Sequence, residues 1–349
     1  MKNKILALLA SVGLVASASA VEINENLSIN GFIDASYTHQ DDNDRGEAQQ
    51  LGVDEIELNF LFNHGPVSGA IHIDDYIGDA DSTSADNSDV EIEQAHVTYS
   101  MDNGVSFTVG KYGSALGFER EDPAGLYTYS RAYRDNITTD AGLITANGTN
   151  SLGNDFNLGN VDANVVEGLT VAYAADAFSL AVSLENDIDA NIDTDNLDAE
   201  VSFAYTGIEN VSLGGGYFFD NQDNNTDEVD ILNLHVAVTA GKLLLAAEYV
   251  ELQGQDAANG GDRDGYLLLA DYDWTDKLGV ALRYSSNEAG VDTDGNIANG
   301  YEDVADADTF TIAPNYALTD NLGVIVEYSD IDLGTTDADL LALEVTYTF

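Results

Sequence analysis

The chain of 349 residues contains no cysteine, only three prolines, and only 11 lysines and arginines against 63 aspartates and glutamates. The absence of cysteine excludes disulfide scaffolds, thiolate metal sites and cysteine nucleophiles. A formal net charge of −52 argues against nucleic-acid binding, because such a chain repels phosphate backbones. An apolar content of 44% still supplies enough hydrophobic surface for a folded protein.

The first twenty residues predict a secretory signal peptide. Lys2 and Lys4 form a basic start, residues 5–16 form an apolar run, and residues 18–20 read Ala-Ser-Ala, a small-residue cleavage site. The run is too short for a membrane-spanning helix, and no cysteine follows that could carry a lipid anchor. We expect an exported chain with one domain, residues 21–349, nine basic and 63 acidic residues and a formal charge of −54.

Apolar and polar residues alternate with a period of two along most of this domain. A strand gathers such residues on one face, whereas a helix scatters them. The alternation is clearest near the C-terminus, where one face of residues 339–349 carries Leu341, Leu343, Val345, Tyr347 and Phe349. It recurs in residues 27–37, 55–62, 178–185, 278–285 and 322–329. The pattern predicts an all-β fold.

Short and long connections alternate between the predicted strands. The short turns lie near residues 64–65, 102–103, 176–177, 207–210, 240–241, 275–276 and 319–321. The long polar links are 39–51, 78–88, 112–164, 187–197, 221–228, 253–264, 288–307 and 332–337. This layout predicts a transmembrane antiparallel β-barrel of sixteen strands of about nine to twelve residues, with both termini at the rim of short turns. An apolar stretch at 137–147 would raise the count to eighteen if it formed a strand pair.

Aromatic residues favour the barrel over a soluble β-sandwich or β-solenoid, which also show alternation. Tyrosine and tryptophan prefer the lipid–water interface, because each ring is apolar while its hydroxyl or N–H needs a polar partner. Nine of them lie on the predicted outward face, many near strand ends: Tyr99, Tyr173, Tyr205, Tyr272, Trp274, Tyr284, Tyr316, Tyr328 and Tyr347. The opposite face is rich in Gly, Ala, Ser, Thr and acids, which suits a wet lumen better than a packed core.

At this point the sequence resembles a family. The opening strand Leu-Ser-Ile-Asn-Gly-Phe-Ile-Asp-Ala-Ser-Tyr (27–37) and the closing Val-Thr-Tyr-Thr-Phe (345–349) resemble those of general porins of Gram-negative outer membranes. The run 109–119, continuing to 127–131, is similar to the start of the long inward-folded loop of that family. The resemblance implies a water-filled channel, often homotrimeric, for passive diffusion of ions and small hydrophilic solutes. It also implies that Tyr347 and Phe349 belong to the signal read by the barrel-assembly machinery.

The longest link, 112–164, is the candidate constriction loop. Four of the nine basic residues of the exported chain fall between positions 111 and 134, with acids among them. If this loop folds inward, its charges face the barrel wall and set up a field across a narrow passage. The candidate loop residues are Lys111, Glu119, Arg120, Glu121, Asp122, Arg131 and Arg134. The alternative is that the arginines only pin the loop through local ion pairs.

Strand parity predicts which charged residues of the wall face the lumen. They are Asp34, Glu57, Asp74, Glu185, Arg283, Glu327 and Glu344. Their balance, like that of the whole chain, is strongly acidic, which predicts a preference for cations and departs from any assumption of anion selectivity.

No catalytic site, cofactor or tight metal site is expected. The five histidines have no metal-ligand spacing, although His72 and His96 fall at lumen-facing positions of adjacent predicted strands. Acidic segments at 41–44, 187–198, 220–227 and 292–296 offer oxygen ligands for loosely bound Ca²⁺ or Mg²⁺. Position 301, where a calcium loop would place its glutamate, is Tyr301. The alternative function is a surface adhesin or structural barrel whose acidic loops make cation-bridged contacts.

Overall fold

The computed structural model describes residues 20–42, 46–76, 90–119, 123–133, 165–186, 197–221, 230–253, 262–291, 303–332 and 337–349. Within these residues no helix is long and apolar enough to cross a membrane. The elements of the described residues are one short 3-10 helix, η1 (Pro123–Gly125), and the strands β1 (Val21–Asn24), β2 (Leu27–Asp42), β3 (Gly46–His64), β4 (Val67–Tyr76), β5 (Glu91–Ser100), β6 (Val105–Gly113), β7 (Val165–Ala174), β8 (Phe178–Asn186), β9 (Leu197–Ile208), β10 (Val211–Phe219), β11 (Asp230–Ala240), β12 (Leu243–Gln253), β13 (Arg263–Asp273), β14 (Leu278–Val291), β15 (Asp303–Ala317), β16 (Leu322–Asp332) and β17 (Asp337–Thr348).

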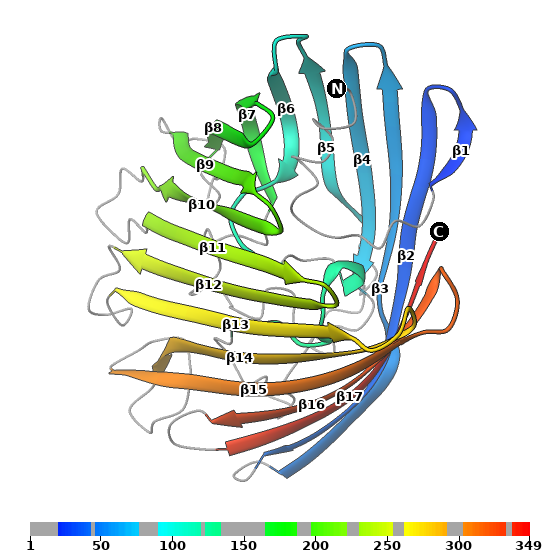
Figure 1. The fold of residues 1–349 in the computed structure, drawn as a ribbon, viewed down its shortest axis with the longest axis vertical. Coiled ribbons are helices and arrows are strands. Elements are labelled where there is room, and N and C mark those ends of the chain that lie inside the picture. The colour runs from blue at the N-terminus through cyan, green and yellow to red at the C-terminus, as the bar shows by residue number, and fades with distance from the viewer. Residues whose placement is uncertain are drawn as a thin grey trace.

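Strands β2 to β17 form a closed antiparallel barrel (Figure 1). Each strand pairs with its neighbour in sequence, and β17 closes the ring by pairing with β2 from Ala338↔Asp42 to Thr348↔Phe32. The prediction of a sixteen-stranded barrel is therefore confirmed. The short strand β1 is an addition that the alternation did not predict, and it pairs with the start of β2 at Val21↔Ile29.

The predicted short turns join the strands at one rim, which we call the turn rim; the opposite end is the loop rim. Gly65 and Gly241 have φ of 63° and 66°, a left-handed conformation that glycine adopts without strain. Two of the long links, predicted at 39–51 and 288–307, are shorter than predicted. The strands that flank them continue to pair towards the loop rim, beyond the residues that show hydrophobic alternation. The ladder β2–β3 continues to Asp42↔Gly46, and the ladder β14–β15 continues to Val291↔Asp303.

The two faces of the barrel differ sharply, as the alternation predicted. On β17, Leu341, Leu343 and Val345 are exposed on the outside, whereas Ala342 and Glu344 are buried on the inside. Exposed large apolar residues occur on the outer face of every strand from β2 to β17, although β2, β10, β12 and β14 carry only one each. A continuous apolar exterior is stable only against lipid.

Aromatic residues flank this apolar belt. Near the turn rim, the exposed rings include Tyr99, Tyr173, Tyr205, Tyr272, Trp274, Tyr316 and Tyr347, which confirms their predicted outward position. Towards the loop rim, tyrosine hydroxyls donate to acids on neighbouring strands: Tyr217 to Asp230 at 2.9 Å, Tyr284 to Asp308 at 2.9 Å, and Tyr328 to Asp339. Each of these tyrosine hydroxyls thus has a carboxylate as hydrogen-bond acceptor, as expected for rings at the lipid–water interface.

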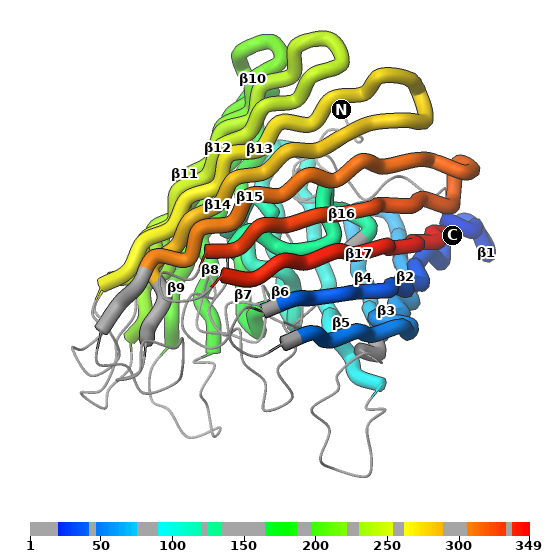
Figure 2. Tube along the Cα trace, turned by 90° about the horizontal axis from the view of Figure 1, so that it is seen from below, coloured from blue at the N-terminus to red at the C-terminus, as the bar shows by residue number. Residues whose placement is uncertain are grey.

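The seam between β2 and β17 lies beside β1 at the turn rim, where Figure 2 places the C-terminus. Gly31 and Phe349 exchange two backbone hydrogen bonds, of 3.1 and 3.0 Å. The Phe349 ring lies over Gly31, where an added Cβ would be 2.9 Å from Cζ of Phe349 and 2.1 Å from the carbonyl oxygen of Glu57. A glycine covered by an aromatic ring is a known device for holding a register.

Replacing Gly31 by valine should open this seam. The new Cβ overlaps backbone as well as the Phe349 ring, so we expect a loss of about 3 kcal/mol. The measurement is the temperature at which the folded band is lost on unheated versus heated denaturing gels. Gly323→Val on β16 is the matched control, since a Cβ there meets nothing within 4 Å. Equal melting of both variants would contradict the packing argument.

Candidate constriction site inside the barrel

The chain turns into the barrel directly after β6. We call residues 114–119 and 123–133 the inner segment; Figure 1 shows it, with η1, within the ring of strands. The contacts of the inner segment reach β9, β11, β12, β14, β16 and β2 in turn, so it follows the inside of one half of the wall. The prediction that this loop folds inward agrees with these contacts.

Wall carboxylates hold the first part of the inner segment through its backbone and a serine hydroxyl. Glu200 on β9 accepts from Ser114 Oγ at 2.5 Å and from Ala115 N at 3.1 Å. Asn233 on β11 accepts from Gly117 N at 3.2 Å. The two Glu200 bonds are charge-assisted and stronger than neutral ones, and together with the neutral Asn233 bond they fix the entry of the loop.

Glu248 on β12 is the central anchor. Its Oε1 accepts from Phe118 N at 2.5 Å and from Asn233 Nδ2 at 2.8 Å, and its Oε2 accepts from Tyr133 Oη at 3.1 Å. Since Phe118 and Tyr133 lie on the outgoing and returning arms of the inner segment, one buried carboxylate ties both arms to the wall.

Arg283 on β14 makes the densest set of contacts. Its Nη1 donates to both carboxylate oxygens of Glu119 at 3.1 Å, to Thr128 Oγ1 at 2.7 Å and to the Ser130 carbonyl at 2.5 Å. Its Nη2 donates to Ser130 Oγ at 2.8 Å and to the Arg131 carbonyl at 2.9 Å. The guanidinium is fully buried, so its charge is balanced by the Glu119 carboxylate.

The far end of the inner segment is held by β16 and β2. Glu327 on β16 accepts from the backbone N of Ser130 at 3.0 Å and from its hydroxyl at 2.5 Å. Ser36 on β2 lies 3.1 Å from the hydroxyl of Tyr129. The described contacts therefore run from β9 round to the seam.

An apolar cluster lies between the inner segment and the wall. Leu116, Ala132 and Tyr133 pack against inward side chains of β10 to β15: Phe218, Ile231, Ala246, Val250, Leu252, Leu267, Leu269, Ala281 and Ala313. The expectation that the inner face is everywhere too polar for a packed core is wrong for this half of the barrel. Burial of these side chains, at roughly 25 cal/mol per Å², adds to the polar anchors.

The other half of the wall carries carboxylates without such partners. Glu57 on β3, Asp74 on β4 and Glu185 on β8 are 1%, 2% and 1% exposed. Within the described part of the chain, neither oxygen of any of the three has a hydrogen-bond partner. The barrel is thus asymmetric: Glu200, Glu248 and Glu327 receive the inner segment on one side, whereas Asp74 and Glu185 receive no described hydrogen bond on the other and Glu57 lies 3.1 Å from His72 Nδ1.

The sequence profile of Gram-negative porins matches residues 6–336. The chain belongs to the Gram-negative porin family. Family and fold together make this porin an outer-membrane channel for the passive diffusion of small solutes. No match was found among curated protein sequences.

Solved porin structures share the fold. OmpF of Salmonella typhi, in complex with daunomycin, matches 95% of this chain and 100% of its own at 15% identity, with a TM-score of 0.65. The outer-membrane channel DcaP of Acinetobacter baumannii matches 95% of this chain and 99% of its own at 14% identity and a TM-score of 0.61. The anion-selective porin of Comamonas acidovorans matches 93% and 99% at 11% identity, also with a TM-score of 0.61. Identities this low show the architecture alone.

The structure places all seven predicted wall residues of the porin inside the barrel. Arg283 and Glu327 hold the inner segment, as described above. Asp34 and Glu344 lie by the seam, where Asp34 accepts from Thr346 Oγ1 at 2.9 Å. Both are almost fully buried. Glu57, Asp74 and Glu185 lie on the opposite half.

Of the seven predicted loop residues, Glu119 and Arg131 lie in the inner segment, Lys111 lies on β6, and four lie outside the described residues. Glu119 lies in the inner segment and pairs with Arg283, so the ion pair that pins the loop has its cation on the wall. Lys111 is not in the loop: β6 runs to Gly113, and Lys111 shares the outer face of Phe107 and Val109, with Nζ 3.2 Å from the Ile92 carbonyl. Arg131 contributes its carbonyl to Arg283 and has a partly buried side chain. The remaining four candidates lie outside the described residues: Arg120, Glu121, Asp122 and Arg134.

Other predictions also fall outside the described residues. They concern the signal peptide before residue 20, the extra strand pair at 137–147 and most of the acidic segments proposed for loosely bound Ca²⁺ or Mg²⁺. These stay predictions.

Sequence reasoning missed Glu200, Asn233, Glu248 and Glu93. The first three occupy inward positions, but nothing in strand parity distinguishes an acid that receives a loop from one that does not. Glu93 was missed because the ladder β4–β5 is irregular: His72 pairs with Gln94 and Ile73 with Ile92. This bulge turns Glu93 inward, where it is 8% exposed, and leaves Ile92 outside at 55%.

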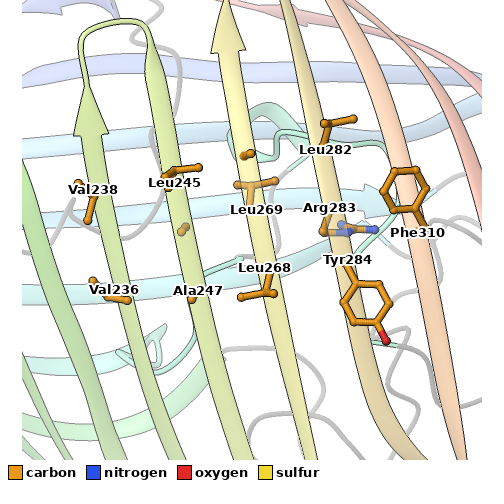
Figure 3. Close-up of a pocket in the computed structure, with 12 residues that line it drawn as sticks. Val236, Val238, Leu245, Ala247, Leu268, Leu269, Leu282, Arg283, Tyr284 and Phe310 are labelled. Atoms are coloured by element: carbon orange, nitrogen blue, oxygen red, sulfur yellow. The ribbon is translucent and has the colours of Figure 1, made fainter.

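The outer face of the porin behind the apolar cluster has a shallow hollow (Figure 3). Small side chains at Ala247 and Ala270 form its floor, and larger apolar residues surround it: Val236, Val238, Leu245, Leu268, Leu282, Tyr284 and Phe310. Arg283 lies between Leu282 and Tyr284 on β14 but is buried on the inside of the barrel. Successive residues of this strand therefore face the lipid and the lumen in turn.

Proposed function

We propose that this porin is a cation-preferring diffusion channel whose passage runs between the inner segment and the wall of β3 to β8. The proposal rests on the asymmetry of the charges. The described anchors of the inner segment lie on strands from β9 round to β16 and β2, whereas Glu57, Asp74 and Glu185 lie on β3, β4 and β8. In the anchored half, Arg283 is paired with Glu119, and Glu200, Glu248 and Glu327 accept hydrogen bonds from the inner segment.

The uncompensated carboxylates carry the argument for cations. Asp74 and Glu185 have no hydrogen-bond partner among the described residues, and Glu57 has His72 as its one described ion-pair partner, so no lysine or arginine of the described wall cancels their negative potential. Confined water between low-dielectric walls strengthens such a field, which concentrates ions of the opposite sign. The acidic balance of the whole chain acts in the same direction at both mouths.

The test is the reversal potential of the purified porin in a planar bilayer under a KCl gradient. We expect a sign that reports K⁺ permeability above Cl⁻ permeability, with a preference that weakens at high salt because the charges are screened. A reversal potential of the opposite sign would refute the proposal. The absence of any conductance would instead contradict the channel itself.

A further inference from the structure

We infer that the inner wall of β3, β4 and β5 holds a divalent transition-metal site, with Zn²⁺ as its representative ion, formed by Glu57, His72 and Glu93. One ligand comes from each strand. His72 Nδ1 lies 3.1 Å from Glu57 Oε1 and 3.5 Å from Glu93 Oε2, and the three ligand atoms all lie within 4.8 Å of one another.

These separations suit a metal better than direct hydrogen bonds. Zinc binds imidazole nitrogen and carboxylate oxygen at about 2.0–2.2 Å, so tetrahedral ligands are about 3.3–3.5 Å apart. The two measured His72 distances are close to that spacing. Neither contact has hydrogen-bond geometry, and Glu57 Oε1, Glu93 Oε2 and His72 Nδ1 have no hydrogen-bond partner within the described chain, so apart from these two contacts the three atoms are free to bind an ion.

Burial makes the unpaired groups informative. Glu57 is 1% exposed, and neither of its oxygens has a described hydrogen-bond partner. Buried polar atoms in folded proteins are almost always satisfied by protein, water or an ion, because an isolated buried charge is costly. Asp74, directly opposite Glu57 in the ladder, adds two more oxygens without a described hydrogen-bond partner to this part of the wall, although it lies outside the three-residue cluster.

The β-bulge is a second, independent observation. In a regular ladder Glu93 would point to lipid, and its inward orientation depends on the irregularity between β4 and β5. Bulges commonly serve to re-aim one side chain at a site. The imidazole decides the class of ion: nitrogen with carboxylates suits Zn²⁺ and similar transition metals, whereas Ca²⁺ and Mg²⁺ prefer oxygen ligands alone.

The experiment is isothermal titration of ZnCl₂ into the folded, detergent-solubilised porin after chelator treatment. A chain this acidic binds divalent ions at many exposed carboxylates, so the titration is made in excess Ca²⁺, which occupies them. We expect one zinc ion to bind per chain with Ca²⁺ present. His72→Gln and Glu93→Gln should each weaken binding about tenfold or more, because each removes one ligand.

Glu185→Gln is the matched control, since it removes an equally buried, unpartnered wall acid from β8, outside the cluster. We expect it to bind zinc like the unmodified chain. The proposal is overturned if Ca²⁺ abolishes zinc binding, if His72→Gln binds zinc unchanged, or if no zinc binds because His72 forms a protonated ion pair with the two glutamates. Gel shifts on heating verify that each variant is folded. Binding is measured without a bilayer, so its outcome does not depend on ion selectivity.

Discussion

Replacing Arg283 by methionine should release the inner segment from β14 and destabilise the barrel by about 3–5 kcal/mol, the usual cost of leaving a buried ion pair with one partner. The substitution leaves the Glu119 carboxylate without its cation, with Ala132 N at 2.9 Å as its remaining described donor, and removes the donor of two backbone carbonyls. We expect a lower melting temperature on heated gels. In planar bilayers, we expect a single-channel conductance that is larger and noisier, because residues 123–133 lose their main contact with the wall.

Two variants separate charge from geometry. Arg283→Lys keeps the positive charge but cannot reproduce the planar fork of donors, so its effect should be intermediate. Lys277→Met removes a positive charge at the turn rim, where the side chain is exposed, and should leave conductance unchanged. If Arg283→Met conducts and melts like the unmodified porin, the carboxylates of Glu200, Glu248 and Glu327 suffice to hold the loop.

Neutralising the unpaired wall acids should reduce cation preference several-fold. The triple variant Glu57→Gln, Asp74→Asn, Glu185→Gln keeps side-chain volume and removes three negative charges from the half of the wall that the described inner segment does not contact. Fields in confined clefts change local ion concentrations by about tenfold or more, so the ratio of K⁺ to Cl⁻ permeability should fall by about threefold or more. The reversal potential under a KCl gradient gives this ratio directly.

The control for this triple variant carries the same change in net charge elsewhere. Asp102→Asn, Glu209→Gln and Asp320→Asn lie in exposed turns at the turn rim, where water and salt screen them. Their reversal potential should stay near that of the unmodified porin. An equal shift in both triple variants would mean that total charge, rather than the inner wall, determines selectivity. Stability should fall little in the wall variant, because Asp74 and Glu185 have no described hydrogen bonds to lose and Glu57 loses only its contact with His72.

Alternation in the sequence was sufficient to predict the barrel and the side of the wall on which residues lie. Leu341 and Glu344 show why: in a sheet with lipid on one face, a shift of one residue would place a carboxylate in the membrane, so the register is strongly determined. The same rule placed Arg283 and Glu327 correctly. Trimeric assembly and recognition by the assembly machinery stay predictions from the family resemblance.

The rule fails where local backbone geometry changes parity or where a loop selects its partners. Glu93 faces inward only because of a bulge, whose one sequence signal is that Val90 and Ile92 alternate out of phase with Val97 and Tyr99. Lys111 was grouped with the loop because of its charge and its position next to residue 112, but it lies within β6, which runs to Gly113, and on the outer face of that strand. Glu200 and Glu248 are anchors because the inner segment passes beside them. The path of that segment depends on apolar packing of residues such as Leu116, which the alternation of the strands does not predict.

The joining of β2 to β17 has a consequence for how the molecule forms. Asp34 and Thr346, which touch across this junction, are separated by 312 positions in the chain. Such a contact forms slowly, because the entropy of closing a very long loop is lost before the contact contributes any favourable free energy. Until then both outermost strands present free amide and carbonyl groups, a template for pairing with another chain. The barrel therefore needs protection in the cell until β2 and β17 have paired. Deletion of β17 would leave β2 and β16 as exposed edge strands and favour aggregation.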